Sequence, residues 1–232
     1  MHRSTLALAG AALAAAQGFS TECTDITLTN DWLVATCPTG SDSEITSSVY
    51  LSGKLADNDG TLEWAEDGNY AQSCQDCSLV DGATLQCECR IAAYSSYRDT
   101  SINLEEHIAN YEGHLLSNQT GSVTIPEDSS TPVPSNFAAK LELSDTSDSC
   151  ETTGITITLD GPSDCYYINL GVELSYTSGI TTDNEGWEIV AYSDKECTTA
   201  VKTFTEANDD QCVAFEPNAK AFSVKPLWNA DY

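Results

Sequence analysis

The sequence predicts an all-β protein made of two small disulfide-linked modules, the first of them internally duplicated. Three observations support this prediction. Short runs that alternate apolar and polar residues, such as 26–29 and 32–36, indicate half-buried strands. Segments within the first 117 residues repeat at offsets of 51 to 53 positions. All 10 cysteines follow residue 16, and their even number fits a disulfide framework.

The chain begins with a predicted signal peptide over residues 1–16. Arg3 gives a short basic start, and residues 4–16 are almost all small or apolar. This run is too short to cross a bilayer, and no later segment has the roughly 18 continuous apolar residues that a span needs. We therefore expect a protein that is secreted, extracellular or cell-wall associated, without membrane insertion. Cleavage before Gln17 and cleavage before Phe19 both remain open.

The composition is strongly acidic. Asp and Glu number 36 against 9 Lys and Arg, which gives a formal net charge of −27 at pH 7. Such a chain repels the phosphate backbone of nucleic acids and anionic lipid surfaces, so we expect neither as a partner. Solubility in an extracellular setting explains this acidity better than one specific basic partner does.

The first module, residues 17–117, contains two similar halves. The segment 48–62 recurs as 101–115, at an offset of 53 positions. Two cysteines of the first half recur in the second at offsets of 51 and 52; they are Cys23 with Cys74, and Cys37 with Cys89. A shared pattern of this kind predicts a pseudo-symmetric module.

The local pattern within each half predicts strands joined by tight turns. The alternating runs end at Asn-Asp or Asp-Gly pairs, which are typical of hairpins. In the stretches 51–56 and 104–109, apolar residues lie three to four positions apart over about two turns. We expect short 3₁₀ or α turns there.

Residues 118–136 predict a linker. Serine, threonine and three prolines replace the apolar periodicity in most of this segment. The tripeptide Asn118-Gln119-Thr120 at its edge is the only N-glycosylation sequon of the chain, so Asn118 is the predicted acceptor.

Three motifs of the first module carry a family resemblance. The segment 101–115, its partner ending at 58–64, and the motif 69–74 resemble the repeated signature of the cyanovirin-N homology (CVNH) lectins, most closely those of filamentous fungi. The resemblance covers about 100 residues. It implies a cyanovirin-N-like duplicated β module that binds oligosaccharides or glycoproteins, typically through oligomannose. It also implies two shallow pockets, one in each half, and no catalysis.

The resemblance also implies disulfides. The family pattern pairs Cys23 with Cys37 and Cys74 with Cys89. Cys77 and Cys87 are then nested in the second loop, and we expect them to pair with each other. The alternative is zinc at the motifs 74–77 and 87–89, but tetrahedral coordination is poorly served without a nearby His or second C-x-x-C motif. We expect no metal and no cofactor.

The resemblance implies two sets of sugar-binding residues. The set near the chain start is Thr21, Glu22, Thr39, Gly40, Asn110 and Glu112. The other set is Asp57, Asp59, Asn69, Gln72, Ser73 and Arg90. Short polar side chains on a rigid frame suit neutral sugar hydroxyls. Several of these residues also favour turns, which gives each one a structural explanation as well. Ala92 stands where a family member can place an arginine over the sugar.

Residues 137–232 predict a second small β-sandwich-like module. Alternating runs occur at 154–159, 165–170, 187–192 and 221–226. The four cysteines permit three connectivities. We favour the two pairs that are each separated by 15 positions, Cys150 with Cys165 and Cys197 with Cys212. The pattern predicts no function for this module.

Catalysis is the main alternative to binding. The many carboxylates would suit a glycoside hydrolase, which needs two of them about 5 to 10 Å apart, but a solvated surface explains nearly all of them. Ser-His-Asp or Cys-His chemistry is less favoured, because His107 and His114 alone follow the signal peptide and both lie in the repeated signature. A structural or effector-like protein with decayed sugar sites is a further alternative. We expect a non-catalytic monomer, with a domain-swapped dimer as an option.

Overall fold

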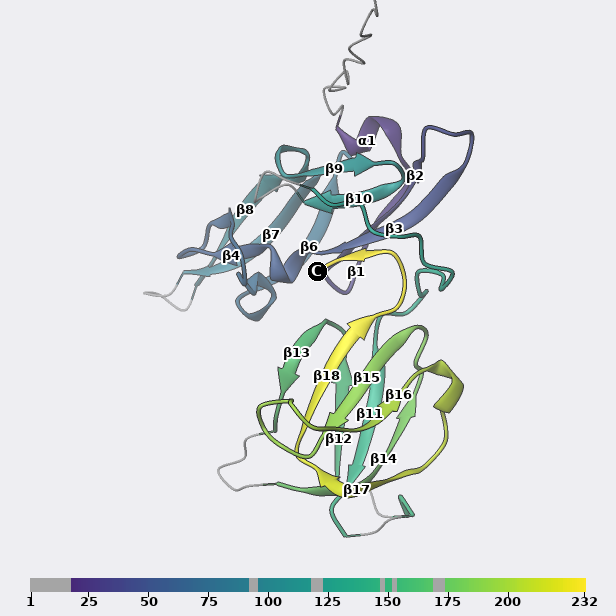
Figure 1. Ribbon diagram of the computed structural model, residues 1–232. Coiled ribbons are helices and arrows are strands. Elements are labelled where there is room, and N and C mark those ends of the chain that lie inside the picture. The colour runs from purple at the N-terminus through teal and green to yellow at the C-terminus, as the bar shows by residue number, and fades with distance from the viewer. Residues whose placement is uncertain (1–17, 92–95, 118–122, 147–148, 152–153, 169–173) are drawn as a thin grey trace, which may run out of the picture.

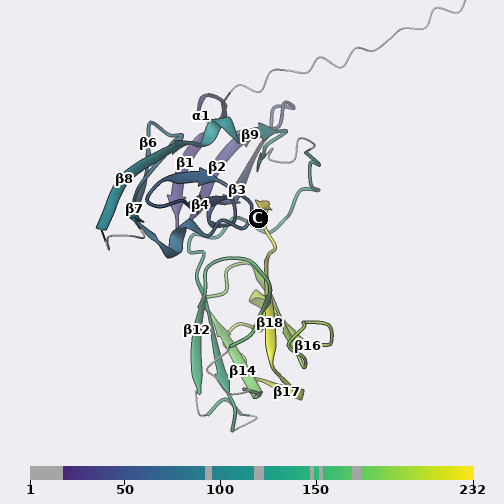
Figure 2. The ribbon, with the colours of Figure 1, turned by 90° about the vertical axis from the view of Figure 1, so that its left-hand side faces the viewer.

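The computed structural model describes residues 18–91, 96–117, 123–146, 149–151, 154–168 and 174–232. The described chain is all β apart from short helical turns, as predicted. Two modules lie end to end, and the C-terminal segment lies at their junction in both views (Figure 1 and Figure 2). The signal peptide and the Asn118 sequon lie outside the described residues and stay predictions.

Each half of the first module contains one three-stranded antiparallel sheet and one hairpin. The sheets have the orders β1-β2-β3 and β6-β7-β8, and the hairpins are β4-β5 and β9-β10. The strands of the first half are β1 (Thr24–Thr29), β2 (Trp32–Pro38), β3 (Glu44–Tyr50), β4 (Leu55–Asp57) and β5 (Leu62–Trp64). Those of the second half are β6 (Cys74–Val80), β7 (Thr84–Ile91), β8 (Ser96–Asn103), β9 (Ile108–Tyr111) and β10 (His114–Ser117).

The turns between these strands follow from the residues that occupy them. Asn30 and Asp31 join β1 to β2 with φ angles of 47° and 65°. Asp81, Gly82 and Ala83 join β6 to β7, and the first two have φ angles of 53° and 76°. A two-residue turn with positive φ at both positions, such as that of Asn30 and Asp31, matches the twist of the strands that it joins, and Asn, Asp and Gly tolerate positive φ best. Local sequence therefore fixes the register of both hairpins.

Four short helical turns repeat the same symmetry. They are α1 (Phe19–Glu22), η1 (Leu51–Gly53), η2 (Tyr70–Gln72) and η3 (Leu104–Glu106). The 3₁₀ turns η1 and η3 confirm the short turns that the sequence predicts. Phe19 of α1 and Tyr70 of η2, 51 positions apart, are both fully buried in the core of the first module. Equivalent apolar positions thus anchor both halves.

The three disulfides predicted for the first module are confirmed. They are Cys23–Cys37, Cys74–Cys89 and Cys77–Cys87. The alternative interpretation of a zinc site at the motifs 74–77 and 87–89 is wrong, because all four cysteines of these motifs are in disulfides. A loop of about 15 residues closed in this way stabilises a fold by up to roughly 3 kcal/mol.

The second module is a pair of four-stranded antiparallel sheets, with the strand orders β12-β11-β14-β17 and β13-β18-β15-β16. Its core packs the buried faces of both sheets, for example Leu141, Ile189 and Phe222. The alternation predicted for 187–192 appears as alternating burial along β15. The elements are β11 (Ala139–Ser144), β12 (Ile155–Leu159), β13 (Ser163–Tyr166), β14 (Tyr176–Thr182), β15 (Trp187–Tyr192), β16 (Ala200–Phe204), η4 (Glu206–Asn208), β17 (Val213–Ala219) and β18 (Ala221–Pro226).

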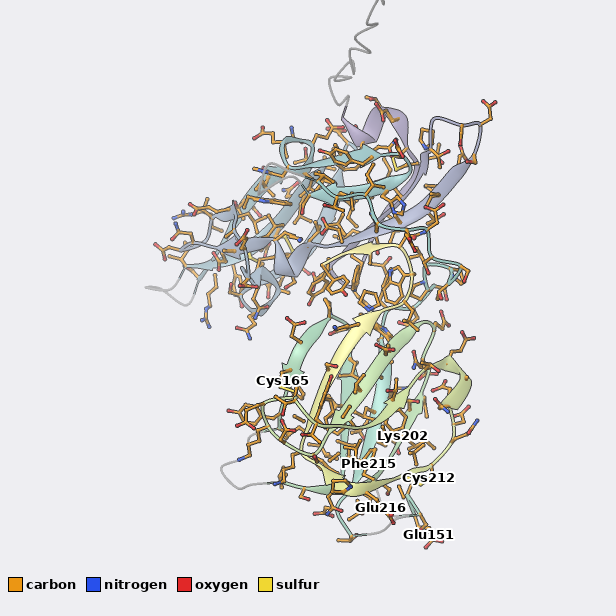
Figure 3. The ribbon with its side chains drawn as sticks, in the orientation of Figure 1. Glu151, Cys165, Lys202, Cys212, Phe215 and Glu216 are labelled. Carbon is orange, nitrogen blue, oxygen red and sulfur yellow. A yellow bond between two sulfur atoms is a disulfide. The ribbon has the colours of Figure 1, made fainter. Side chains whose placement is uncertain are left out.

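The disulfides predicted for the second module are wrong. Cys150 pairs with Cys212, 62 positions away, and Cys165 pairs with Cys197, 32 positions away. Cys150 lies between β11 and β12, whereas Cys212 directly precedes β17 of the same sheet. Figure 3 labels Cys212 beside Glu151, at the end of the module away from the junction. Each bridge therefore joins segments that the sheet topology brings together, and equal spacing along the chain says nothing about that topology.

The chain returns to the first module at its end. The last strand, β19 (Ala230–Asp231), pairs in parallel with β3, with Ala230 opposite Ser48 and Asp231 opposite Val49. The connecting segment is held to the same region, because Thr131 forms an isolated bridge with Trp228. The C-terminal residues thus belong to the sheet of the first module.

Within the described residues, no helix is long and apolar enough to span a membrane.

Candidate functional site

Each predicted set of sugar-binding residues combines segments of both halves. We call the set near the chain start the first pocket and the other set the second pocket. In the first pocket, the turn from Asn110 to Gly113 lies on the segment that follows Cys37. In the second, the turn from Asp57 to Gly60 lies against Cys89 of β7. The hairpin turn of one half therefore packs on the disulfide-bonded strands of the other half.

Asn110 holds the first pocket together. Its Nδ2 donates hydrogen bonds to Glu22 Oε2 and to the carbonyl of Pro38, both at 3.1 Å. Its Oδ1 accepts one from the backbone N–H of Gly113 at 2.8 Å. One amide thus joins three segments that are distant in sequence, so the carboxylate and the turn are held in place before any ligand arrives.

A close approach of backbone and side chain shapes the turn beside Asn110. Gly113 has φ of +95°, and a Cβ there would lie 3.0 Å from side-chain atoms of Ile45 and Thr39. Glu112 precedes it with φ of 52° and an exposed side chain. Glycine is needed at position 113, because both the conformation and the space disfavour a side chain.

The loop between β2 and β3 adds a row of hydroxyls. Thr39 Oγ1 lies 2.9 Å from Ser41 Oγ and 2.7 Å from Ser43 Oγ. Gly40 opens into an adjacent hollow of about 520 Å³, which Asp42, Ser43 and Glu44 also line. Hydroxyls and carboxylates of this kind exchange hydrogen bonds with neutral polar ligands.

The α1 turn supplies the other wall of the first pocket. Thr21 is exposed, and its Oγ1 donates a hydrogen bond back to the Gly18 carbonyl of the same turn at 2.9 Å. Glu22 is half-buried beside Asn110. The turn is anchored to η3, since the Ser20 N–H donates to Glu105 Oε1 at 3.0 Å. Glu22, Pro38 and Asn110 are thus held together by hydrogen bonds, and Thr21 and Thr39 are the chain neighbours of Glu22 and Pro38.

Asp57 is the counterpart of Asn110 in the second pocket, 53 positions earlier. Its Oδ1 accepts a hydrogen bond from the Gly60 N–H at 2.7 Å, which matches the bond from Gly113. Asp59 has φ of 51° and matches Glu112. Asp57 also lies near Cys74 and Cys89, within the spacing of a metal site. Their disulfide leaves only one carboxylate as a ligand, so this trio does not suit a metal.

The remaining residues of the second pocket divide into exposed and structural ones. Gln72 and Arg90 are exposed, and the Arg90 N–H donates to the carbonyl of Ser73 at 3.0 Å. Asn69 serves the backbone instead, with φ of 52° and an N–H that donates to the Ser52 carbonyl at 2.7 Å. Asn69 therefore has the structural role in a turn that the sequence suggests as an alternative to sugar binding. Ala92 lies outside the described residues.

Both histidines have structural partners. The His107 ring stacks on the Trp64 ring, with centroids 4.4 Å apart and an angle of 7° between the planes. His114 is buried, and its Nε2 lies 3.0 Å from Asp128 Oδ1. Neither imidazole is next to a hydroxyl or thiol nucleophile in the part of the chain that the structure describes.

Sequence reasoning missed part of the first pocket. The Pro38 carbonyl is a backbone acceptor, and a pattern of side chains cannot predict its role. The residues of the hollow, Asp42, Ser43 and Glu44, were also not singled out. A signal was present, because the loop 38–44 reads PTGSDSE and concentrates small and polar residues directly after a pocket residue.

Comparison with known proteins places the first module in a family. Residues 19–116 match the family model described as the CVNH domain. The recognition of this domain from the sequence is therefore confirmed, and the match does not extend to the second module.

Several solved structures match the same region. One is a MoCVNH3 variant in complex with (N-GlcNAc)4, at 24% identity over 43% of this chain and 95% of that one, with a TM-score of 0.40. GzCVNH from Gibberella zeae is 24% identical over 43% of this chain and 96% of that one, with a TM-score of 0.40. Microvirin in its mannobiose complex is 28% identical over 42% of this chain and 95% of that one, with a TM-score of 0.38.

Proposed function

Because residues 19–116 form a CVNH domain, the domain of a carbohydrate-binding lectin family, we propose that this protein is a secreted, non-catalytic lectin. It binds mannose-type oligosaccharides or glycoproteins at the first and second pockets, one in each half of the first module. The mature protein acts as a monomer outside the cell, where its disulfides persist.

The observation that carries this proposal is the position of Asn110. Its amide uses both donors and its acceptor on the protein, which leaves Glu22 and the nearby hydroxyls of Thr39 and Ser43 to face a ligand from fixed positions. A net hydrogen bond to a sugar hydroxyl contributes only about 1 kcal/mol. Such weak contacts give useful affinity only when their geometry is set in advance, because ordering flexible groups on binding would offset them.

Two pockets on one rigid module increase the effect of each. The second pocket offers the exposed Gln72 and Arg90 beside the turn of Asp57. When a branched glycan reaches both pockets, the second contact becomes intramolecular, and avidity can exceed either affinity by about 10² or more. We therefore expect clustered glycans to bind far better than single sugars.

The choice of sugar is the finer part of the proposal. Microvirin is solved with mannobiose, and the MoCVNH3 variant with (N-GlcNAc)4. A panel must therefore contain oligomannose and N-acetylglucosamine oligomers side by side. Our proposal is that oligomannose binds more tightly, as the resemblance of the repeated signature implies.

Titration calorimetry of the oxidised protein with short mannose oligomers tests the two pockets. We expect two sites per chain. Asn110→Asp keeps the acceptor for Gly113 but removes both donors and places a second carboxylate near Glu22, so affinity at the first pocket should fall about tenfold. The double variant Gln72→Ala, Arg90→Ala should weaken the second pocket alone, since both side chains are exposed.

Asn218→Asp is the matched control, because it makes the same chemical change at an exposed position of β17. It should bind like the wild type. A correctly oxidised wild type that binds neither sugar class contradicts the lectin proposal. Sugar binding that survives both pocket variants would show that the sites lie elsewhere.

A further inference from the structure

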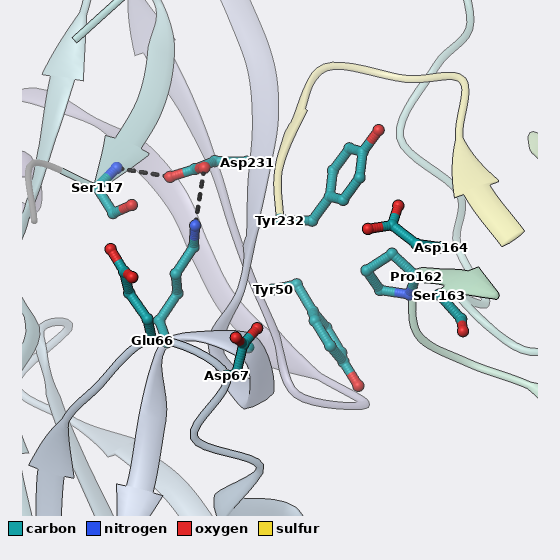
Figure 4. Close-up of a pocket in the computed structure, with 11 residues that line it drawn as sticks. Tyr50, Glu66, Asp67, Ser117, Pro162, Ser163, Asp164, Asp231 and Tyr232 are labelled. Carbon is teal, nitrogen blue, oxygen red and sulfur yellow. Dashed lines mark hydrogen bonds and ion pairs between the residues drawn. The ribbon is translucent and has the colours of Figure 1, made fainter. Parts of the chain in front are cut away.

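A groove separates the two modules on the side where the chain ends. Its volume is about 510 Å³, which is within the range of about 300 to 1,000 Å³ found for small-molecule sites. Tyr50, Asp67 and Ser117 line it from the first module, Asp164 lines it from the second, and Tyr232 lines it from the C-terminal segment (Figure 4). The groove contains none of the residues of the first or second pocket.

Two tyrosine rings lie in the middle of the groove (Figure 4). Tyr232 follows β19 and is 49% exposed. Tyr50 is half-buried, and its ring packs on Trp32 with centroids 4.9 Å apart. Tyr50 is therefore fixed by the junction, whereas Tyr232 presents its ring to solvent.

The wall that carries these rings is tied down by Asp231. Its Oδ1 lies 3.2 Å from Lys54 Nζ, and its Oδ2 accepts a hydrogen bond from the Ser117 N–H at 2.6 Å. The same residue pairs with Val49 in the sheet. The groove is thus preformed by contacts between the C-terminal segment and the first module.

The groove is acidic on both walls. Glu66 and Asp67 lie on the side of the first module, and Asp164 lies on the side of the second (Figure 4). These three exposed carboxylates have no side-chain partner among the residues that the structure describes. Among the lining residues that the structure describes, Lys54 is the one cation, and Asp231 already pairs with it. A bound anion would therefore be repelled, and a cation would be attracted.

We propose that this groove binds a protonated amino-sugar oligosaccharide, such as a glucosamine oligomer. Aromatic faces pack on the C–H faces of sugar rings and also attract ammonium groups. The carboxylates of both walls pair with the amines of neighbouring sugar units. A neutral sugar leaves these charges unused. The groove acts independently of the two lectin pockets, so either proposal can fail alone.

Binding of glucosamine oligomers by the full-length, oxidised protein tests this proposal. The titration is run at about pH 5.5, where exposed carboxyls are ionised and the amines are protonated. Three probes are compared: a glucosamine hexamer, the N-acetylglucosamine hexamer and a hexalysine peptide. We expect the glucosamine hexamer to bind most tightly and to weaken strongly at 1 M salt, because salt screens exposed charges.

Groove variants assign the site. Tyr232→Ala should weaken the glucosamine hexamer at least about fivefold, whereas Tyr232→Phe should not. Asp164→Asn and Asp67→Asn should each weaken it about two- to fivefold. Tyr167→Ala is the matched control, because this tyrosine is 47% exposed and lies outside the groove. Circular dichroism checks that every variant is folded.

Each other outcome overturns the proposal. Equal binding of the N-acetylated hexamer removes the role of the amines, and equal binding of hexalysine shows that the groove recognises charge without the sugar. If Tyr232→Ala binds the glucosamine hexamer as tightly as the wild type, the binding site lies outside the groove. Asn110→Asp should not change glucosamine binding, and a large loss would place this ligand in the first pocket.

Discussion

The Trp32 ring stacks on the ring of Phe137, with centroids 5.2 Å apart and an angle of 10° between the planes. Trp32 belongs to β2 of the first module, and Phe137 lies just before the first strand of the second. The Trp32 Nε1 also donates to the Asp160 carbonyl at 2.9 Å, and the Trp228 Nε1 donates to Ser48 Oγ at 2.9 Å. The modules therefore share one aromatic core and should unfold as one unit.

Trp32→Ala should break this coupling. The side chain is fully buried and contacts Tyr50, Phe137, Trp187 and Trp228. Loss of a buried tryptophan of this kind costs about 3 to 5 kcal/mol. We expect the single calorimetric transition of the wild type to separate into two, because the cavity lies at the junction.

Phe215→Ala is the control for this prediction. Phe215 is 2% exposed and packs on Phe204 and Phe222 inside the second module. It should lower stability by a similar amount without separating the transitions at the junction. Two transitions in the wild type itself would contradict a shared core.

The duplicated first module could be predicted from the sequence because its determinants are local. Hairpin turns such as Asn30-Asp31 set their own register, and the repeat carries the same turns and cysteines into the second half. The bond from the Asn110 amide to Glu22, in contrast, spans 88 positions. Only the family resemblance brought these two residues into one predicted pocket.

The junction could not be predicted, because its residues are ordinary in sequence. Trp32 lies on the face of β2 opposite to Leu33 and Ala35, which pack in the core of the first module, and nothing local says that this other face joins the core of the second module. The parallel pairing of Ala230 with Ser48 spans most of the chain. The groove beside Tyr232 depends on both features and was therefore missed as well.

The long disulfide of the second module should matter most for its stability. Cys150–Cys212 closes 62 positions, against 14 for Cys23–Cys37. In the chain-entropy model, removal of the disulfide that closes the long loop lowers the free energy of unfolding by about 4 kcal/mol, and removal of the disulfide that closes the short loop lowers it by about 3 kcal/mol. Urea denaturation of the two Cys-to-Ser double variants measures this difference.

Peptide mapping without reduction checks the pairing itself. Fragments that contain Cys150 should be linked to those with Cys212, and fragments with Cys165 to those with Cys197. Recovery of Cys150 linked to Cys165 would contradict the topology described above. The short first-module loop is an internal reference in the same digest.

Asp31 should make stability depend on pH. Burial raises the pKa of its carboxyl, the hydrogen bond from Tyr70 opposes this, and the charge of Asp160 adds to it. A raised pKa means that this contribution to stability is present below the ordinary aspartate value of about 3.9 and is lost as the pH rises through the folded-state pKa. Asp31→Asn stays neutral, so it should gain stability over the wild type as the pH rises to neutrality.

Asp194→Asn provides the opposite sign. Backbone N–H donors, first that of Thr198, lower the pKa of Asp194, so its contribution is present above the ordinary value and is lost as the pH falls through the folded-state pKa. This variant should be less stable than the wild type at neutral pH, with a difference that shrinks in acid. Urea denaturation across the acidic range compares both variants, and parallel curves for Asp31→Asn and the wild type would contradict the prediction.

Gly113→Ala should connect stability to sugar binding. An alanine at φ of +95° is strained by about 1 to 2 kcal/mol, and its Cβ would also press on Ile45 and Thr39 at 3.0 Å. Gly40→Ala is the control, because Gly40 has φ of +80° but nothing within 4 Å of the added carbon. In urea denaturation, the free energy of unfolding of both variants should fall by this strain energy, and that of Gly113→Ala should fall further. Mannose titration should then show a weaker first pocket in Gly113→Ala, because Thr39 must move. Equal losses of stability would mean that the contact with Thr39 is relaxed easily and that the turn does not hold the pocket in place.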